Sequence, residues 1–115
     1  MKTLKNYIKF SNSVKVIIPS QEKTGAEIKD LEALRIEVQN ALTELFGGAT
    51  LSSAVGTYRL ETGVIQREGV SICESYTDVL TEQKTSTVIE ICEALKVKAN
   101  QESIALNING ELYFI

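Results

Sequence analysis

The most regular pattern in the chain is helical and lies between residues 28 and 45. Apolar residues recur there at intervals of three and four, which places them on one face of a helix: Ile28, Leu31, Leu34, Val38, Ala41, Leu42 and Leu45. Thr24 is the predicted N-cap of this helix, and Gly47 with Gly48 predicts its end, because glycine tolerates positive φ. The same spacing predicts a second helix over about residues 80 to 98. Its cap candidates are Thr77, Asp78 and Thr81, and Asn100 ends it.

The remaining segments alternate with a period of two, which is typical of strands. Strands are predicted over residues 14–18, ending at Pro19, and over 50–60, 64–76, 104–108 and 111–115. Glu61-Thr62-Gly63 and Asn109-Gly110 predict hairpin turns, because Gly63, Asn109 and Gly110 accept positive φ. The small residues of the strand over 50–60 indicate close approach by another element, with helix-on-sheet packing as the favoured interpretation. Residues 1–12 fit either a short helical turn or a strand.

This order predicts one α+β domain spanning residues 1–115. Crossover helices between strands, with a hairpin in the middle, fit the ferredoxin-like βαββαβ arrangement with an additional short C-terminal strand. Both helices then cover one face of an antiparallel sheet. The predicted strands nevertheless carry apolar residues on both faces, which calls for a second cover. That cover is either the N-terminal segment with Tyr7 and Phe10 or another subunit, and we predict a homo-oligomer, a dimer or a trimer.

Composition excludes several functions. The net charge of −3 argues against nucleic-acid binding, and no apolar run reaches the length of a membrane span, so neither nucleic acid nor a membrane is expected as a partner. The chain has no histidine, which removes the commonest general base and metal ligand, and no metal or other cofactor is predicted. Cys73 and Cys92 lack a C-x-x-C context and are expected to be reduced, buried thiols of a cytoplasmic protein.

Two polar groups are candidate ligand-binding residues. Tyr58, Arg59 and Arg67 lie near the tip of the central hairpin, where arginine forks bind phosphate or carboxylate and tyrosine stacks on a ring. The alternative is an exposed hairpin in which Glu61 and Glu68 pair with the arginines.

Glu74 and Tyr76 form the second group, on the strand face that also carries Ile72. A buried Glu74 would need a partner or a proton. The favoured interpretation is that this strand end is solvated, or that a bulge at Gly69 shifts the register.

The element order, the length and the long central hairpin are similar to the ferredoxin-like small proteins of the PII and CutA type. That resemblance implies a trimer, and PII-type proteins bind nucleotides in clefts between subunits. Here the connection Glu61-Thr62-Gly63 is much shorter than the PII regulatory loop and no glycine-rich nucleotide loop is present, so no binding residue is carried over. The stretches FGGAT, the G-x-Y hairpin and NQES-IALNINGELYFI also resemble short uncharacterised proteins of bacteria and their phages.

These observations lead to a non-enzymatic, oligomeric binding module as the first functional hypothesis. Its ligand is a small anion, nucleotide-like in character, held near Arg59 and Arg67 at a subunit boundary. The alternative is a protein-binding adaptor or inhibitor, encoded by a phage or other mobile element, that uses an open sheet edge. An enzyme relying on Glu74 with Tyr76 is the third hypothesis.

Overall fold

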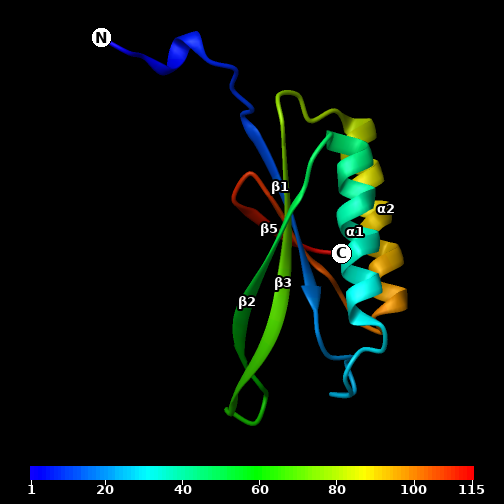
Figure 1. Ribbon diagram of the computed structural model, residues 1–115. Helices are drawn as coiled ribbons and strands as arrows, with labels where there is room; N and C mark the ends of the chain where they lie inside the picture. Colours follow the sequence, from blue (N-terminus) through cyan, green and yellow to red (C-terminus); the bar gives the residue numbers. More distant parts are fainter.

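The computed structural model describes all residues 1–115 as two helices packed on one face of a five-stranded sheet (Figure 1). The elements follow the order η1 (Leu4–Asn6), β1 (Asn12–Pro19), α1 (Leu31–Phe46), β2 (Thr50–Arg59), β3 (Ile65–Thr77), α2 (Glu82–Lys98), β4 (Ala105–Ile108) and β5 (Glu111–Phe114). The spatial order of the strands is β2-β3-β1-β4-β5, and all four pairings are antiparallel. The predicted ferredoxin-like architecture with an extra C-terminal strand is confirmed.

Helix α1 begins three residues later than the apolar spacing predicts. Residues 21 to 27 instead form a small hairpin-like loop, in which Gln21 bridges Glu27 and the amide of Ile28 donates to the carbonyl of Ser20 at 3.1 Å. Ile28 therefore fills the core from an extended segment. Asp30, at φ 52°, precedes the first helical residue, so the prediction that Thr24 caps the helix is wrong. The predicted end is confirmed, since Gly47 adopts φ 88° and its amide reaches the carbonyl of Thr43.

Helix α2 begins at the last of its three cap candidates. The hydroxyl of Thr81 accepts a hydrogen bond from the amide of Lys84 at 3.1 Å, which satisfies one of the free N–H groups of the first turn. The helix ends at Lys98, and Asn100 follows in the left-handed region at φ 49°. Neither helix is long and apolar enough to cross a membrane.

The core lies between the helices and the inner face of the sheet. Alternate residues of β1 point toward the helices and are fully buried, as the period-two pattern predicts. Fourteen apolar residues form this core: Val14, Val16, Ile18, Ile28, Leu34, Val38, Leu42, Cys73, Val88, Cys92, Leu95, Ala99, Ile104 and Leu106. Cys73 and Cys92 are both unpaired thiols here, in agreement with the sequence.

The other side of the sheet, which we call the open face, has no covering element within the chain. The register places Ile17 opposite Ile72 and Lys15 opposite Glu74 on this side. It also carries three large apolar side chains that remain about half exposed or more, namely Tyr76 at 51%, Leu112 at 53% and Phe114 at 70%. Strand β2 exposes Ser52 on this side, whereas its start packs on the other side: Leu51 contacts the core and α1 contacts β2, so the expected helix packing is confirmed there.

The molecule is elongated. Its Cα radius of gyration is 15.7 Å, whereas a compact domain of this length would have about 13 Å. The β2–β3 hairpin runs past the other strands at one end, and the N-terminal arm, residues 1–11, projects from the opposite end (Figure 1). The arm contains a single helical turn and is exposed throughout, with Ile8 at 92%. It does not cover the open face, so that alternative from the sequence is wrong.

Candidate functional site

A polar cleft lies between the outer part of the hairpin and the loop that follows β1. Its volume is about 450 Å³, within the range of small-molecule sites. We call it the acidic cleft. Three segments line it: residues 21–25, four side chains of the hairpin (Tyr58, Leu60, Gln66 and Glu68), and residues 101–103.

The hairpin wall follows from strand register. Tyr58 pairs with Gln66, and Gly56 pairs with Glu68, so Tyr58, Gln66 and Glu68 share one side of the two-stranded ribbon. A Cβ at Gly56 would make ordinary van der Waals contact, at 3.9 Å, with the carbonyl oxygen of Glu68 and with Val70. The ring of Tyr58 remains 47% exposed and is available to a ligand.

Glu68 joins the hairpin to the wall of the cleft that residues 21–25 form. Its Oε1 accepts hydrogen bonds from the amides of Ser20 at 3.1 Å and Gln21 at 2.9 Å. The carboxylate thus satisfies two backbone donors where β1 ends and the loop begins. The expectation that Glu68 pairs with an arginine is wrong, because the chain has only three ion pairs and Glu68 is in none of them.

The third wall is joined to the loop by the end of α2. The amide of Lys23 donates to the carbonyl of Asn100 at 3.0 Å, and the Asn100 side chain donates to Glu22 at 3.2 Å. Gln101 adds a bond to the carbonyl of Gln21 at 2.6 Å. The left-handed backbone of Asn100 makes these contacts possible, because it turns the chain back toward the loop. All three walls are therefore hydrogen-bonded into one frame.

The charge of the cleft favours a cation. Its lining contains the carboxylates of Glu22, Glu68 and Glu102 and one ammonium group, that of Lys23, which gives a formal charge of −3 + 1 = −2. A positively charged ligand group would be stabilised there by Coulomb attraction. No group of three or more metal-ligating side chains is close enough to hold a metal ion.

The structure separates the residues that the sequence placed together near the hairpin tip. Arg59 and Arg67 lie on the same side of the ribbon, since Arg59 pairs with Ile65 and Thr57 with Arg67. Tyr58 lies on the other side. Arg59 donates to the carbonyl of Gly63 at 3.3 Å within the turn.

Glu74 and Tyr76 are adjacent on the open face, far from the arginines. Arg67 and Glu74 are seven steps apart along an extended strand, which is about 23 Å. Glu74 forms an ion pair with Lys15 at 3.4 Å and keeps a quarter of its side chain exposed. A hydrogen bond with Glu74 raises the pKa of Tyr76. Glu74 is therefore partly exposed and paired, between the buried and the solvated interpretations, and the β2–β3 register continues past Gly69 without a bulge.

An open groove of about 500 Å³ lies beside this pair. It is lined by residues 46–50, by Glu74, Ser75 and Tyr76, and by Phe10 from the N-terminal arm. The hydroxyl of Ser75 donates to the carbonyl of Gly48 at 2.7 Å, which holds the end of α1 against β3. The groove has one carboxylate, already paired with Lys15, and therefore offers a ligand less than the acidic cleft does.

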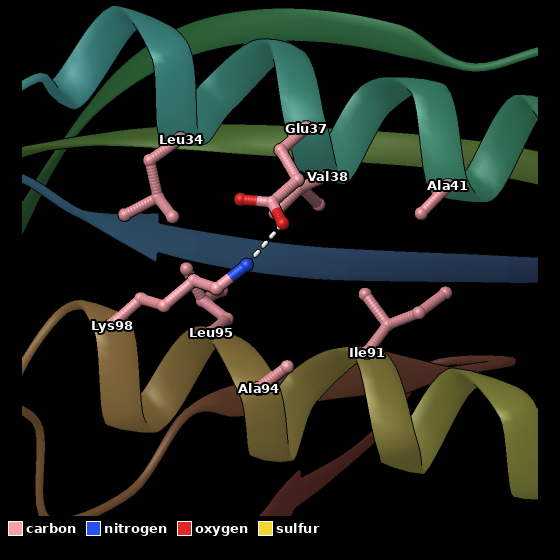
Figure 2. A pocket seen from close by; sticks show the side chains of 8 residues that line it. All are labelled: Leu34, Glu37, Val38, Ala41, Ile91, Ala94, Leu95 and Lys98. Carbon is pink, nitrogen blue, oxygen red and sulfur yellow. Dashed lines mark hydrogen bonds and ion pairs between the residues drawn. The ribbon is translucent and has the colours of Figure 1, made fainter.

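A third, smaller cavity lies between the two helices (Figure 2). Its volume is about 110 Å³, too small for a nucleoside, and its walls are mainly apolar. Glu37 of α1 and Lys98 of α2 form an ion pair across it (Figure 2). We interpret it as an imperfection in helix packing, because its only polar groups already satisfy each other.

Comparisons with known proteins were made at the level of sequence and of structure. No family model matches the chain, and no curated relative matches it. A phage SAM lyase in complex with S-methyl-5'-thioadenosine has a similar structure, with a TM-score of 0.65 and 18% identity over 98% of this chain and 95% of that one. The apo state of a phage SAM lyase also has a TM-score of 0.65 and 18% identity, over 92% of this chain and 89% of that one. CutA from Synechococcus elongatus has a TM-score of 0.50 and 13% identity, over 88% and 78%. These likenesses confirm the CutA-type fold and its occurrence in a phage protein.

Proposed function

We propose that the chain is a homo-oligomer that binds a sulfonium nucleoside of the S-adenosylmethionine (SAM) class in the acidic cleft. The observation that carries the proposal is the formal charge of −2 on a cleft that also contains an exposed tyrosine. Support comes from the shared fold of a phage protein whose substrate is SAM. The ligand class differs from the anion that the sequence suggested, because the cleft is acidic.

Each part of such a ligand has a partner of suitable chemistry in the cleft. The sulfonium centre carries a positive charge, which the carboxylates of Glu22, Glu68 and Glu102 would stabilise. The ring of Tyr58 offers a face for the adenine or for the cation. The amides of Gln66 and Gln101 can donate to or accept from the base and the ribose hydroxyls. A methionine carboxylate would find Lys23 at the rim.

Self-association is the second part of the proposal. Tyr76, Leu112 and Phe114 expose apolar surface on the open face, and no element of the chain shields it. Such a surface is typical of an interface between subunits. The small residues of β2 allow close approach, and association here would place a neighbouring subunit near the cleft. The buried, unpaired thiols support a cytoplasmic location.

Arg59 and Arg67 favour a second candidate ligand. Their guanidinium groups share one side of the hairpin and form no ion pair, so they remain available to an anion such as a phosphate. Glu74 and Tyr76 would join them only across a subunit boundary. The protein-binding alternative would use the free edge of β2 or of β5.

Isothermal titration of the full chain with SAM tests the proposal. The informative variant is Glu102→Gln, because Glu102 makes no hydrogen bond or ion pair and its removal changes only the charge of the cleft. We expect SAM affinity to fall about five- to tenfold, which corresponds to roughly 1 kcal/mol for one partly exposed charge. Glu61→Gln, at the hairpin tip outside the cleft, is the matched control and should bind normally.

Two outcomes would overturn the assignment: no SAM binding at millimolar concentration, or equal loss of affinity in both variants. Binding of inorganic phosphate that is abolished by Arg59→Ala with Arg67→Ala, and not by Glu102→Gln, would select the second candidate. Chromatography of the same mixture for S-methyl-5'-thioadenosine shows whether the bound SAM is also cleaved.

A further inference from the structure

The outer edge of β5 has no partner strand within the chain. β5 is the last strand of the sheet and pairs only with β4. Natural edge strands usually carry lysine, proline or a bulge that discourages pairing with another chain. β5, residues Glu111 to Phe114, is short and carries one charge, that of Glu111, but it has no lysine, proline or bulge, and all four of its residues are exposed.

The hydrogen-bonding groups of this edge can be located from the register. Ile104 and Ile115 exchange both of their backbone hydrogen bonds, at 3.0 and 2.9 Å. Because such pairs alternate along an antiparallel ladder, the amide and carbonyl groups of Leu112 and Phe114 point outward, away from β4. The same two residues present their side chains on the open face. The edge therefore combines free backbone groups with exposed apolar side chains.

The N-terminal arm has the complementary properties. Tyr7 is extended at φ −118° and ψ 153°, and the chain continues to β1 without further helical structure. In an extended segment Ile8 and Phe10 point to one side, and Tyr7 and Lys9 to the other. Ile8 is 92% exposed and Phe10 54%, although a monomer gains nothing from exposing them.

Charge distinguishes the arm from the rest of the molecule. Lys2, Lys5 and Lys9 give residues 1–11 a formal charge of +3, and the arm has no acidic residue. Since the whole chain carries −3, residues 12–115 carry −6. The arm is therefore attracted to the body of a second copy.

Hydrogen bonds at the base of the arm fix the point at which it leaves the sheet. The side chain of Asn12 donates to the carbonyl of Asp78 at 3.0 Å and accepts from the Asn109 side chain at 2.9 Å. The amide of Ser13 is held by Asn109 as well, at 2.8 Å. From this fixed point the arm leaves the body (Figure 1). Phe10 lines the groove beside Glu74 and Tyr76, but it stays 54% exposed and the rest of the arm is exposed as well, so a second copy can supply a partner surface.

We propose that residues 7–10 of one copy pair as an added strand along the free edge of β5 in a second copy. Ile8 and Phe10 lie beside Leu112 and Phe114 on the open face, and Lys9 lies on the side of Glu111. The backbone of the arm supplies the hydrogen bonds, and the alternate apolar side chains supply the selectivity. The inference rests on the self-association part of the proposed function and is independent of the ligand.

Photo-crosslinking between isotopically distinct copies tests this contact. A benzophenone amino acid replaces Ile8 in unlabelled chain, which is mixed with ¹⁵N-labelled chain before irradiation. We expect cross-linked peptides of mixed isotope composition that join position 8 to residues 111–115. Leu112→Pro in the labelled chain removes an outward amide without touching the β4 ladder, and should lower this yield at least about tenfold. Leu112→Lys, which keeps the amide and adds repulsion toward the arm, should lower it as well.

Val97→Lys is the control, because Val97 is 78% exposed on α2 and far from β5, and its yield should match wild type. Cross-links within one copy only, cross-links to another surface of the second copy, or none at all would each overturn the proposal. SAM titration of the Leu112 variants separates this result from the ligand assignment: unchanged affinity with lost cross-links leaves the cleft intact.

Discussion

Glu68 is the residue whose removal should most clearly show how the acidic cleft is held together. Its Oε1 accepts hydrogen bonds from the backbone amides of Ser20 and Gln21, at 3.1 and 2.9 Å, in a partly buried position. A hydrogen bond to a charged group contributes about 1.5–3 kcal/mol, and partial exposure places these two toward the low end. We therefore expect Glu68→Ala to lower the free energy of unfolding by about 2–4 kcal/mol.

Glu68→Gln separates the structural from the electrostatic role. The amide keeps an acceptor oxygen for Ser20 and Gln21 but loses the charge, so about half of the stabilisation should remain. SAM affinity should fall in both variants, and in Glu68→Gln it should fall without a matching loss of fold.

Urea denaturation followed by circular dichroism is the assay, with an unchanged m-value as the sign that the same surface unfolds. Each kcal/mol corresponds to about 4 °C in the melting temperature of a domain of this size. Glu61→Ala, in the exposed hairpin turn, should unfold like wild type. If Glu68→Ala also unfolds like wild type, the account of how the loop is attached to the hairpin is wrong.

Three further predictions concern the core, the thiols and the open face. Leu42→Ala, at a fully buried site of α1, should cost about 2–5 kcal/mol in urea denaturation, and a loss below 1 kcal/mol would show that the helix is not packed as described. Burial raises the pKa of the Cys73 and Cys92 thiols from 9.0 to about 11. The stability that these protonated thiols contribute is therefore complete below pH 9 and lost as the pH rises through 11. Thermal melting as a function of pH measures this loss, and a flat profile from pH 9 to 11 would contradict it. Ile72→Lys on the open face should convert the proposed oligomer to monomer in light scattering, whereas Val97→Lys should not, and an unchanged mass for Ile72→Lys would refute the interface.

Much of the fold follows from local sequence. The alternation of Val14, Val16 and Ile18 predicts a strand with one buried face. Gly47 predicts the end of α1, because the left-handed backbone at that position suits glycine. Ile28 shows where local pattern fails. Its spacing continues the helical repeat, but the bridge between residues 21 and 27 fixes it in an extended segment. The periodicity correctly predicts that Ile28 is buried, but it does not predict the backbone conformation that places Ile28 in the core.

The acidic cleft could not be predicted, because it joins segments that are distant in sequence. Glu68 was identifiable as a charged residue of the hairpin, but its bonds to Ser20 and Gln21 depend on where β1 ends beside β3. Nothing in the sequence around Glu102, apart from its position after a helix, predicts that it lines a cleft. The one available clue was the alternation of Tyr58 with Arg59, which already places their side chains on opposite sides of a strand.

The comparison of SAM with S-adenosylhomocysteine tests the account most directly. The two molecules differ by one methyl group and by the positive charge on sulfur, so the ratio of their dissociation constants isolates the contribution of that charge. Titration of the full chain should show SAM binding at least about tenfold more tightly, equivalent to about 1.4 kcal/mol, with the ratio reduced in Glu102→Gln. Equal affinities, or tighter binding of the uncharged thioether, would contradict a cleft built for a cation.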